Sequence, residues 1–445
     1  MQLKRELGLW AAVSIVIGTI IGSGIFLVPK TMILRVGSPE MVFFVWIFGG
    51  LLSLAGALTY GELAAAYPEA GGEYVYLREA YGPMFGYLYG WTQLWVAKSG
   101  SIATLASGFY LYLAYFFPVL EGNAANLAGF NISWGQLFAV GLIGALSLVN
   151  YYGVRVGGNV QVATTALKIV LILAIIAAGL FAGRGNVENL KAAIPAPTGI
   201  AAFFAALVAA LWAYDGWNNV TMVASEIRNP QRDLPRALIF GTLGVVAVYL
   251  LINLTYFFVL SPGEVASSDR VAAAMMRKIA GAAGATAVSV AALITIFSAL
   301  NGAILTGARV PYAMAKDGLF FSKIASIHPQ HATPGPSLLL LGAWSALLVL
   351  SGTFDQLFNY VIFASWLLYG MAGASVIVLR YKRPMLDRPY RAIGYPWVPA
   401  LFVLVSAAFV VSTLFSSPNE SIRGLVLIFL GLPPYFYWKA RRLTH

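Results

Sequence analysis

The sequence predicts an all-α protein that crosses a membrane many times. Of its 445 residues, 60% are hydrophobic and only 10% are charged, whereas soluble domains carry about 25% charged residues. The apolar residues gather in runs long enough to cross a bilayer, which takes roughly 20 residues of helix. Two of these runs are interrupted near their middle by glycine and polar residues, and these interruptions carry most of the functional information.

Twelve apolar runs, separated by charged residues, proline and glycine, are each predicted to form a membrane-spanning helix. They cover approximately residues 8–33, 40–66, 83–118, 133–151, 157–182, 199–226, 235–260, 283–314, 336–352, 357–380, 397–415 and 421–438. A further segment, 264–280, has a helical pattern but is too polar to span, so we expect it to lie over one face. The whole chain, residues 1–445, is expected to form a single transmembrane domain.

The basic residues predict the orientation of these helices. If the runs alternate across the bilayer, the greater share of the 28 Lys and Arg falls on the side that holds both chain ends. Basic loops stay in the cytoplasm, so both termini are predicted to be cytoplasmic in a protein of the cytoplasmic (inner or cell) membrane. Because these residues lie in short loops, the net charge of +11 indicates topology and not a nucleic-acid-binding surface.

The first run is interrupted by Gly18-Thr19-Ile20-Ile21-Gly22-Ser23-Gly24-Ile25-Phe26. Its glycines and hydroxyls disfavour a continuous helix, and every backbone N–H and C=O inside a bilayer needs a partner. An unwound segment is tolerated there only when it is buried or lines a cavity, where its freed N–H groups bind an anion such as a carboxylate. The alternative is a small-residue face that lets two helices pack closely.

The sixth run carries the second interruption, Leu211-Trp212-Ala213-Tyr214-Asp215-Gly216-Trp217-Asn218-Asn219. An acid, a glycine, two asparagines and aromatic residues divide it into two predicted half-helices. The two interrupted runs are five apart, and broken helices at matching positions are typical of inverted-repeat transporters with a site at the midplane. We therefore expect one repeat in 1–182, a second in 199–380, and two additional helices and a tail in 397–445.

Several motifs occur in a familiar order along nearly the whole chain. They are Gly22-Ser23-Gly24-Ile25-Phe26 with Pro29, the core Tyr214-Asp215-Gly216-Trp217-Asn218, Glu226-Ile227-Arg228-Asn229-Pro230 followed by Leu234-Pro235-Arg236, Ser298 with Asn301-Gly302 through Arg309, Lys316-Asp317-Gly318, His328-Pro329-Gln330 and Thr333-Pro334. As a set they resemble the amino acid–polyamine–organocation superfamily, and within it bacterial-type members of the L-type amino acid transporter family.

The resemblance implies a LeuT-type fold of five plus five helices with two extra C-terminal helices, in which helices 1 and 6 are unwound at the midplane. It also implies amino acid transport by alternating access, and family members often exchange one amino acid for another. Animal members pair with a glycoprotein through a disulfide. This chain has no cysteine, which excludes such a covalent partner and leaves a non-covalent partner open.

An amino acid carries a carboxylate and an ammonium group on one carbon, and the two interruptions offer partners for both. The N–H groups of Ser23-Gly24-Ile25 and the Ser23 hydroxyl would face the carboxylate at a positive helix end. Carbonyls of Ile20, Trp212 and Asp215 would accept from the ammonium. The expected substrate-binding residues are Thr19, Ile20, Gly22, Ser23, Gly24, Ile25, Trp212, Ala213, Asp215, Gly216 and Asn301.

Two of these residues leave alternatives open. Trp212 is expected to be an aromatic lid over the substrate, the alternative being an ordinary buried tryptophan. Asp215 is costly near the bilayer centre, by roughly 3 kcal/mol, so it needs a partner or a function. It is expected to cap the second half-helix through the N–H groups of Trp217 and Asn218. Recognition of a cationic substrate side chain and proton coupling are the alternatives.

Charged residues outside the interruptions give further expectations. Lys168 lies well inside the fifth run, where its ammonium is expected to donate to unwound carbonyls and do the structural work of a sodium ion. Snorkelling and proton linkage are its alternatives. Lys98, in the third run, is expected to be paired or snorkelling rather than substrate-binding. Glu62 with Arg228 or Arg232 is a candidate inner gate.

These residues together predict a sodium-independent transporter that exchanges neutral L-amino acids. Transport of cationic amino acids or polyamines through Asp215, proton-coupled uniport or symport, and an amino acid sensor or channel are the alternatives. We do not expect an enzyme, because the three histidines, His328, His331 and His445, form no nucleophile–base or metal motif. No cofactor and no metal site are expected.

Overall fold

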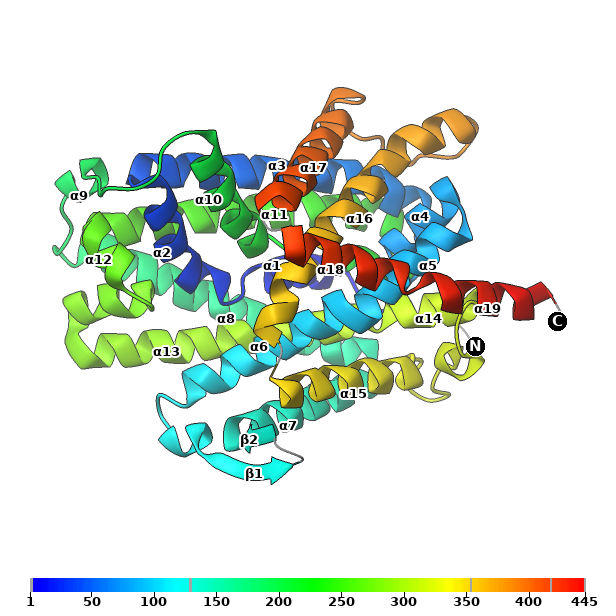
Figure 1. The fold of residues 1–445 in the computed structure, drawn as a ribbon, viewed down its shortest axis with the longest axis horizontal. Coiled ribbons are helices and arrows are strands. Elements are labelled where there is room, and N and C mark those ends of the chain that lie inside the picture. The colour runs from blue at the N-terminus through cyan, green and yellow to red at the C-terminus, as the bar shows by residue number, and fades with distance from the viewer. Residues whose placement is uncertain (1–2, 128–129, 353, 417, 444–445) are drawn as a thin grey trace.

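The computed structural model is a helical body with a single small β-hairpin among the described residues (Figure 1). It describes residues 3–127, 130–352, 354–416 and 418–443, so His445 and the outermost residues of the predicted domain lie outside it. In Figure 1 the short loop helices α9 (Glu188–Lys191) and α12 (Pro262–Ser267) lie at one end. Helices α14 (Arg309–Lys316) and α19 (Leu432–Leu443) and both chain ends lie at the other.

The first half of the chain forms helices that agree with the predicted runs to within a few residues, except for α4, which lies between the second and third runs and was not predicted. They are α1 (Leu9–Ile20), α2 (Gly24–Val36), α3 (Pro39–Ala66), α4 (Glu73–Tyr81), α5 (Pro83–Thr92), α6 (Lys98–Leu113), α7 (Trp134–Tyr151) and α8 (Val154–Phe181). A short π-helix, η1 (Gln93–Ala97), joins α5 to α6, and a 3₁₀-helix, η2 (Pro118–Glu121), precedes the hairpin of β1 (Asn123–Leu127) and β2 (Phe130–Ser133).

The second half begins with α9 and continues through a similar series. Its further elements are α10 (Ile200–Ala213), η3 (Asn219–Glu226), α11 (Pro230–Val259), α12, α13 (Val271–Gly307), α14, η4 (Ser322–Ala325), α15 (Gly335–Ser351), α16 (Phe354–Lys382), α17 (Trp397–Ser416), α18 (Pro418–Phe429) and α19. Within the described residues, seven helices are long and apolar enough to cross a membrane, or up to eight if the bent pair α1–α2 counts as one span.

Local sequence explains where several helices begin and end. Ser133 and Gln136 form a reciprocal capping box that starts α7 directly after the hairpin. Helix α3 starts with Pro39 at its first position, and the Ser38 hydroxyl accepts from the N–H of Met41. Helix α2 ends at Gly37, whose positive φ of 75° suits glycine.

The first predicted interruption separates two helices. Helix α1 ends at Ile20 and α2 starts at Gly24, and the pair is bent by 43°. Packing holds the bend from several sides, because α1 contacts α11, α8 and α13 while α2 contacts α10. The interruption therefore lies inside the protein.

The second interruption differs from the expected pair of half-helices. Helix α10 ends at Ala213, residues 214–218 form turns, and the following segment is the 3₁₀-helix η3, with non-helical backbone angles at Val223. Asparagine, threonine and β-branched residues in this segment favour an α-helix weakly. The break therefore extends over more of the chain than the sequence predicted.

Three other elements correct the sequence-based boundaries. The segment 264–280 is largely helical, as expected, but it is divided: α12 ends at Ser267, α13 begins at Val271, and a kink at Ala280 and Gly281 separates this first part of α13 from the rest. The third run contains the π-helix η1, and the twelfth is divided into α18 and α19. The hairpin was not predicted, since its strands have only five and four residues.

Candidate binding site

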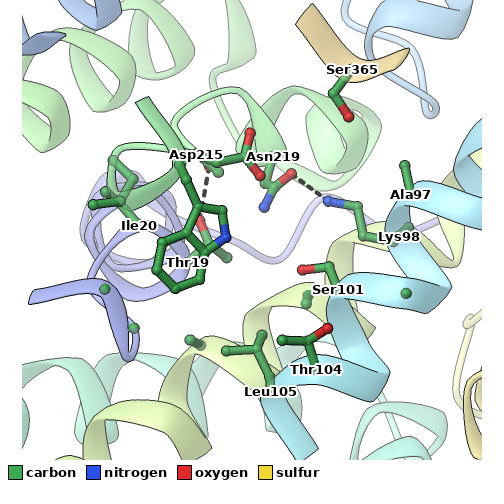
Figure 2. A pocket seen from close by; sticks show the side chains of 18 of the residues that line it. Thr19, Ile20, Ala97, Lys98, Ser101, Thr104, Leu105, Asp215, Asn219 and Ser365 are labelled. Atoms are coloured by element: carbon green, nitrogen blue, oxygen red, sulfur yellow. Dashed lines mark hydrogen bonds between the residues drawn. The ribbon is translucent and has the colours of Figure 1, made fainter. Parts of the chain in front are cut away.

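A cavity of about 90 Å³ lies where the two interruptions meet (Figure 2). Helices α6, α13 and α16 and the π-helix η1 complete its wall. The lining residues are Thr19, Ile20, Gly22, Ser23, Gly24, Gln93, Ala97, Lys98, Gly100, Ser101, Thr104, Leu105, Trp212, Ala213, Asp215, Gly216, Asn219, Ala299, Ala303, Ser365, Trp366 and Tyr369. Nine of the eleven residues expected from the sequence are therefore brought together.

The start of α2 offers unpaired backbone donors to this cavity. Gly24 is the first residue of the helix, so the N–H groups of Gly24 and Ile25 have no acceptor within it. No hydrogen bond joins the N–H of Ser23, Gly24 or Ile25 to another described residue. Such a cluster of N–H groups at a helix N-terminus, with the dipole behind it, favours an anionic ligand.

Small residues let the two interruptions approach each other. A Cβ atom at Gly24 would lie 3.1 Å from the Ala213 Cβ, which is tighter than ordinary contact. At Gly216 the φ angle is 103°, and a Cβ there would lie 3.2 Å from Thr19. The Thr19 hydroxyl donates to the Gly216 carbonyl at 2.9 Å, so both glycines serve the contact between the two breaks.

Tyr249 of α11 ties the two interruptions together from behind. Its buried hydroxyl lies 3.1 Å from the Ile20 carbonyl and 2.8 Å from the Ala213 carbonyl. Both carbonyls end a helix and have lost their intrahelical donors. A carbonyl oxygen can accept two hydrogen bonds, so Ile20 retains capacity for a ligand.

Lys168 makes the contact that the sequence predicted. Its fully buried ammonium donates to the carbonyls of Gly18 and Ile21, each at 2.8 Å. Both acceptors belong to the end of α1, on the far side of the break from α2. The charge therefore holds the end of α1 from the α8 side without lining the cavity.

Asp215 does not form the expected helix cap. Neither Trp217 nor Asn218 donates a hydrogen bond to its carboxylate, and η3 has no side-chain cap. The Asp215 Oδ1 instead accepts from the Tyr369 hydroxyl of α16 at 3.1 Å. Because the turn at 214–218 is not a helix start, the carboxylate remains half-buried at the cavity wall.

Lys98 lines the cavity on the side opposite α1 (Figure 2). Its ammonium donates to Asn219 Oδ1 at 2.6 Å and interacts electrostatically with Asp215 and Glu73. Lys98 is paired, as expected, and it also lines the cavity. The cavity wall thus carries one cation and one anion.

Behind Lys98, α4 holds the polar side of η3. The buried Glu73 carboxylate accepts a short hydrogen bond from Asn218 and a second one, of 2.9 Å, from the Tyr89 hydroxyl. The N–H of Gly71 donates to the Met222 carbonyl at 3.0 Å. Helix α4 therefore positions the second interruption although it supplies no residue to the cavity.

Ile25 and Asn301 do not line the cavity. Ile25 is buried behind the start of α2. Asn301 turns toward α7 and α8, donating to Gln161 Oε1 at 2.8 Å and accepting from Asn150 at 3.0 Å. It is part of a packing network between scaffold helices.

Sequence reasoning missed the walls contributed by α6 and α16. Lys98, Ser101 and Thr104 follow one another at helical spacing and line one side, while Ser365, Trp366 and Tyr369 line another. The first group had a usable signal, since polar residues at three-residue intervals mark one face of an apolar helix. The second had none, because aromatic residues occur throughout the chain.

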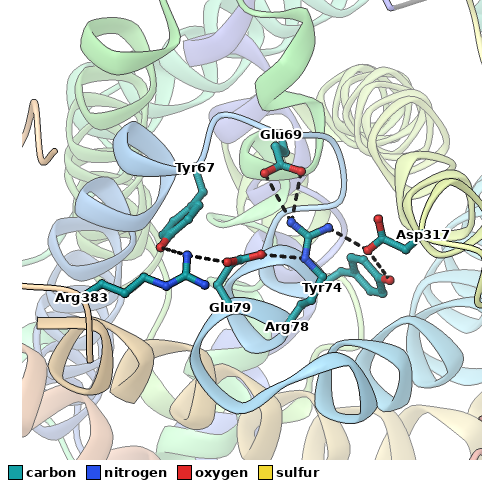
Figure 3. Close-up of polar contacts among 7 residues, drawn as sticks. All are labelled: Tyr67, Glu69, Tyr74, Arg78, Glu79, Asp317 and Arg383. Atoms are coloured by element: carbon teal, nitrogen blue, oxygen red, sulfur yellow. Dashed lines mark hydrogen bonds and ion pairs between the residues drawn. The ribbon is translucent and has the colours of Figure 1, made fainter. Parts of the chain in front are cut away.

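The end of the molecule that carries α14 is held by ion pairs. Arg78 of α4 bonds to Asp317 at 2.7 Å, and Glu79 bonds to Arg383 at 2.7 Å (Figure 3). The inner-gate hypothesis required Glu62 to contact Arg228 or Arg232, and it contacts neither. Glu62 instead pairs with two residues from much farther along the chain, Arg380 at 2.7 Å and Arg388 at 3.2 Å.

A completely buried ion pair lies at the same end. Arg309 bonds to both carboxylate oxygens of Glu226, at 2.7 and 2.9 Å, and both side chains have no exposed area. Next to it, Leu7 and Ile227 form an isolated parallel β-bridge between the segment before α1 and the end of η3. The bridge joins the two interrupted segments, and the ion pair joins η3 to α14.

Comparison with known proteins agrees with this architecture. Residues 7–432 match the family model "Amino acid permease". The chain is 34% identical to the b(0,+)-type amino acid transporter 1 of Mus musculus, covering 99% of this chain and 90% of that protein. It is 33% identical to the serine/threonine exchanger SteT of Bacillus subtilis, covering 99% and 98%, and 32% identical to the Asc-type amino acid transporter 1 of Mus musculus, covering 99% and 83%. The chain belongs to the amino acid permease family.

Proposed function

We propose that the protein is an amino acid exchanger of the cytoplasmic membrane and not an enzyme. The observation that carries this proposal is the cavity between the two interruptions, with free N–H groups at the start of α2 on one side and helix-end carbonyls on the other. The family and the full-length similarity to a serine/threonine exchanger support exchange as the mode of transport.

The common part of every amino acid fits this arrangement. We propose that its carboxylate accepts from the N–H groups of Ser23, Gly24 and Ile25, and that its ammonium donates to the carbonyls of Ile20 and Asp215. Trp212, at the cavity wall beside Gly24, is proposed to cover the bound substrate. Recognition through the backbone leaves the rest of the cavity to select the side chain.

The charges of the cavity wall favour neutral substrates. Asp215 and Lys98 have opposite signs and interact with each other, so together they add no net charge to the cavity. A cationic side chain would meet Asp215 but would be repelled by Lys98. Cationic amino acids stay the second candidate, because Asp215 reaches the cavity and a b(0,+)-type transporter is among the relatives.

We propose that transport does not need sodium. The Lys168 ammonium donates to two carbonyls at the end of α1, which is the structural work that a bound cation would do there. Proton linkage through this buried amine is the alternative.

For the fold, we propose twelve spanning segments in two inverted repeats of five, followed by two extra helices. The bent pair α1–α2 opens the first repeat and α10–η3 opens the second, as inverted repeats with a midplane site require. Each ion pair among the described residues joins two groups that the predicted topology assigns to the same side of the membrane. The side that holds both chain ends is proposed to be cytoplasmic.

The test of function is uptake of radiolabelled alanine into liposomes that contain the protein. Empty vesicles and vesicles preloaded with unlabelled alanine are compared, each with and without external sodium. We expect preloading to stimulate uptake strongly, with equal rates in the presence and absence of external sodium. A sodium requirement would remove the proposed role of Lys168, and uptake of arginine but not alanine would favour the cationic alternative. No uptake of either amino acid would contradict the proposal.

The test of the site is Gly24→Leu. Because a Cβ atom at this position already crowds Ala213, a leucine should displace α2 from α10 and abolish exchange while the protein still inserts. Gly141→Leu is the matched control, since a Cβ at that exposed glycine meets no atom within 4 Å. Equal exchange by both variants would contradict backbone recognition at Gly24.

A further inference from the structure

A second cavity, of about 270 Å³, opens near the end of the molecule that is proposed to be cytoplasmic. It lies between the segment that leads into α1 and the first turns of α8, beside the loop before α11. Its wall includes Glu6, Trp10, Arg155, Asn159, Val162 and Arg228. None of these residues contributes to the cavity between the interruptions.

Two arginines from distant parts of the chain meet at this cavity without a partner. Arg155 and Arg228 are both exposed, and the guanidinium group of neither forms an ion pair or hydrogen bond with any residue that the structure describes. Arg78, Arg309 and Arg380, on the same proposed side, all pair with carboxylates. The single carboxylate in the second cavity, Glu6, compensates only one of the two charges.

Backbone groups add to the positive potential. The cavity is lined by Gly8, Leu9, Trp10 and Ala11, the first residues of the twelve-residue helix α1. Gly8 provides no side-chain cap, so the N–H groups of the first turn stay without intrahelical acceptors. Together with the two guanidinium groups, they form a surface suited to a phosphate group.

The wall of the cavity also includes apolar side chains. Trp10 is 77% exposed, and tryptophan is enriched where a membrane meets water. Val162 lines the cavity farther along α8. A ligand that fits this surface is anionic at one end and apolar at the other.

We propose that this cavity binds the phosphate group of an anionic phospholipid. Arg155 and Arg228 pair with the phosphate, the first turn of α1 donates to it, and the acyl chains lie along Trp10 and Val162. Basic pockets between helices on the cytoplasmic side are a recognised setting for anionic headgroups. The site is independent of the identity of the transported amino acid.

The test measures binding of phosphatidylglycerol to the purified full-length protein in detergent by native mass spectrometry, beside phosphatidylcholine and inorganic phosphate. Phosphatidylglycerol should bind in preference to phosphatidylcholine, and inorganic phosphate should not displace it. Arg155→Gln and Arg228→Gln should each weaken phosphatidylglycerol binding about five-fold, since one basic residue near an anionic surface contributes about that factor. Glu6→Gln should strengthen it.

Two controls keep the test decisive. Arg391→Gln removes another exposed arginine on the same proposed side, without an ion pair among described residues, and should leave binding unchanged. Arg155→Lys keeps the charge and should retain most of the affinity, which separates charge from packing. Thermal unfolding without added lipid should be unaltered in the arginine variants because their side chains are exposed.

Three results would overturn the proposal. One is a loss of phosphatidylglycerol binding in Arg155→Gln and Arg228→Gln that is no larger than the loss in Arg391→Gln. Another is equal binding of phosphatidylcholine, whose headgroup has no net charge. The third is displacement of phosphatidylglycerol by inorganic phosphate, which would assign the cavity to a soluble phosphate compound.

Discussion

A single hydroxyl group, that of Tyr249, holds both interruptions in place. It bonds to the Ile20 and Ala213 carbonyls, one from each interruption. Tyr249→Phe keeps the ring and removes only this hydroxyl. We expect it to lower the free energy of unfolding by about 1–3 kcal/mol, since the single O–H donor that the two buried carbonyls share is lost. Thermal and denaturant unfolding measure this loss, and weaker stabilisation by alanine should accompany it.

Tyr256→Phe is the matched control for this prediction. The Tyr256 hydroxyl is equally buried in the same helix, but it bonds to one carbonyl only, Ile25, at 3.3 Å. Its removal should cost less stability and leave the contact between the interruptions intact. Similar losses of stability and of alanine-induced stabilisation in the two variants would refute the bridging role of Tyr249.

Residue-scale prediction from the sequence succeeded where position alone limits the chemistry. A lysine at the centre of an apolar run must find buried acceptors, and the unwound carbonyls were the only ones expected nearby, so the contact of Lys168 could be predicted. Tyr249 and Tyr369 could not, because the chain has 23 tyrosines and none differs in its local pattern. Asp215 misled the prediction, since a good capping residue caps only where a helix begins.

At the scale of the elements, α4 acts as a support for η3. We expect Glu73→Ala to reduce alanine exchange strongly, because Asn218 and Tyr89 lose a buried acceptor and Lys98 loses a nearby negative charge. Each orphaned donor costs about 1–3 kcal/mol. Exchange in liposomes and thermal unfolding are the measurements.

Glu79→Ala serves as the control on the same helix. Its ion pairs with Arg78 and Arg383 are partly exposed, so their loss should cost about 1 kcal/mol or less. If both alanine variants reduced exchange equally, the effect would belong to α4 in general and not to its contact with η3.

The sequence located the interruptions but not their form. Glycine clusters predict that a helix stops, and α1 and α2 separate as expected. The 3₁₀ geometry of η3 and the π-helix η1 depend on how neighbouring helices pack, and no local residue pattern specifies them. The kink in α13, in contrast, coincides with the predicted boundary between the segment 264–280 and the eighth run, which begins at 283.

For the whole molecule, the buried pair of Glu226 and Arg309 joins η3 to α14. Arg309→Met should destabilise the protein by about 3–5 kcal/mol, because Glu226 is left buried without a partner. The double variant Glu226→Leu with Arg309→Met should recover most of this stability. Thermal unfolding of the three proteins gives the comparison, and a double variant as unstable as the single one would contradict it.

The bridge between Leu7 and Ile227 adds a backbone contact beside this pair, from the segment before α1 to the end of η3. The overall arrangement around them was the most predictable level of the structure. Hydropathy places most of the apolar helices, whereas the walls supplied by α6 and α16 depend on long-range packing that a single sequence does not reveal.

The π-helix η1 has a consequence for how such cavities diversify. The π-helix holds one residue more than an α-helix of the same length. In an α-helix, each residue turns the chain by about 100° around the helix axis. Gln93 before this extra residue and Lys98 after it both line the cavity as a result. Gain or loss of one codon is therefore enough to turn a charged side chain into the cavity or away from it, while both ends of the helix keep their places.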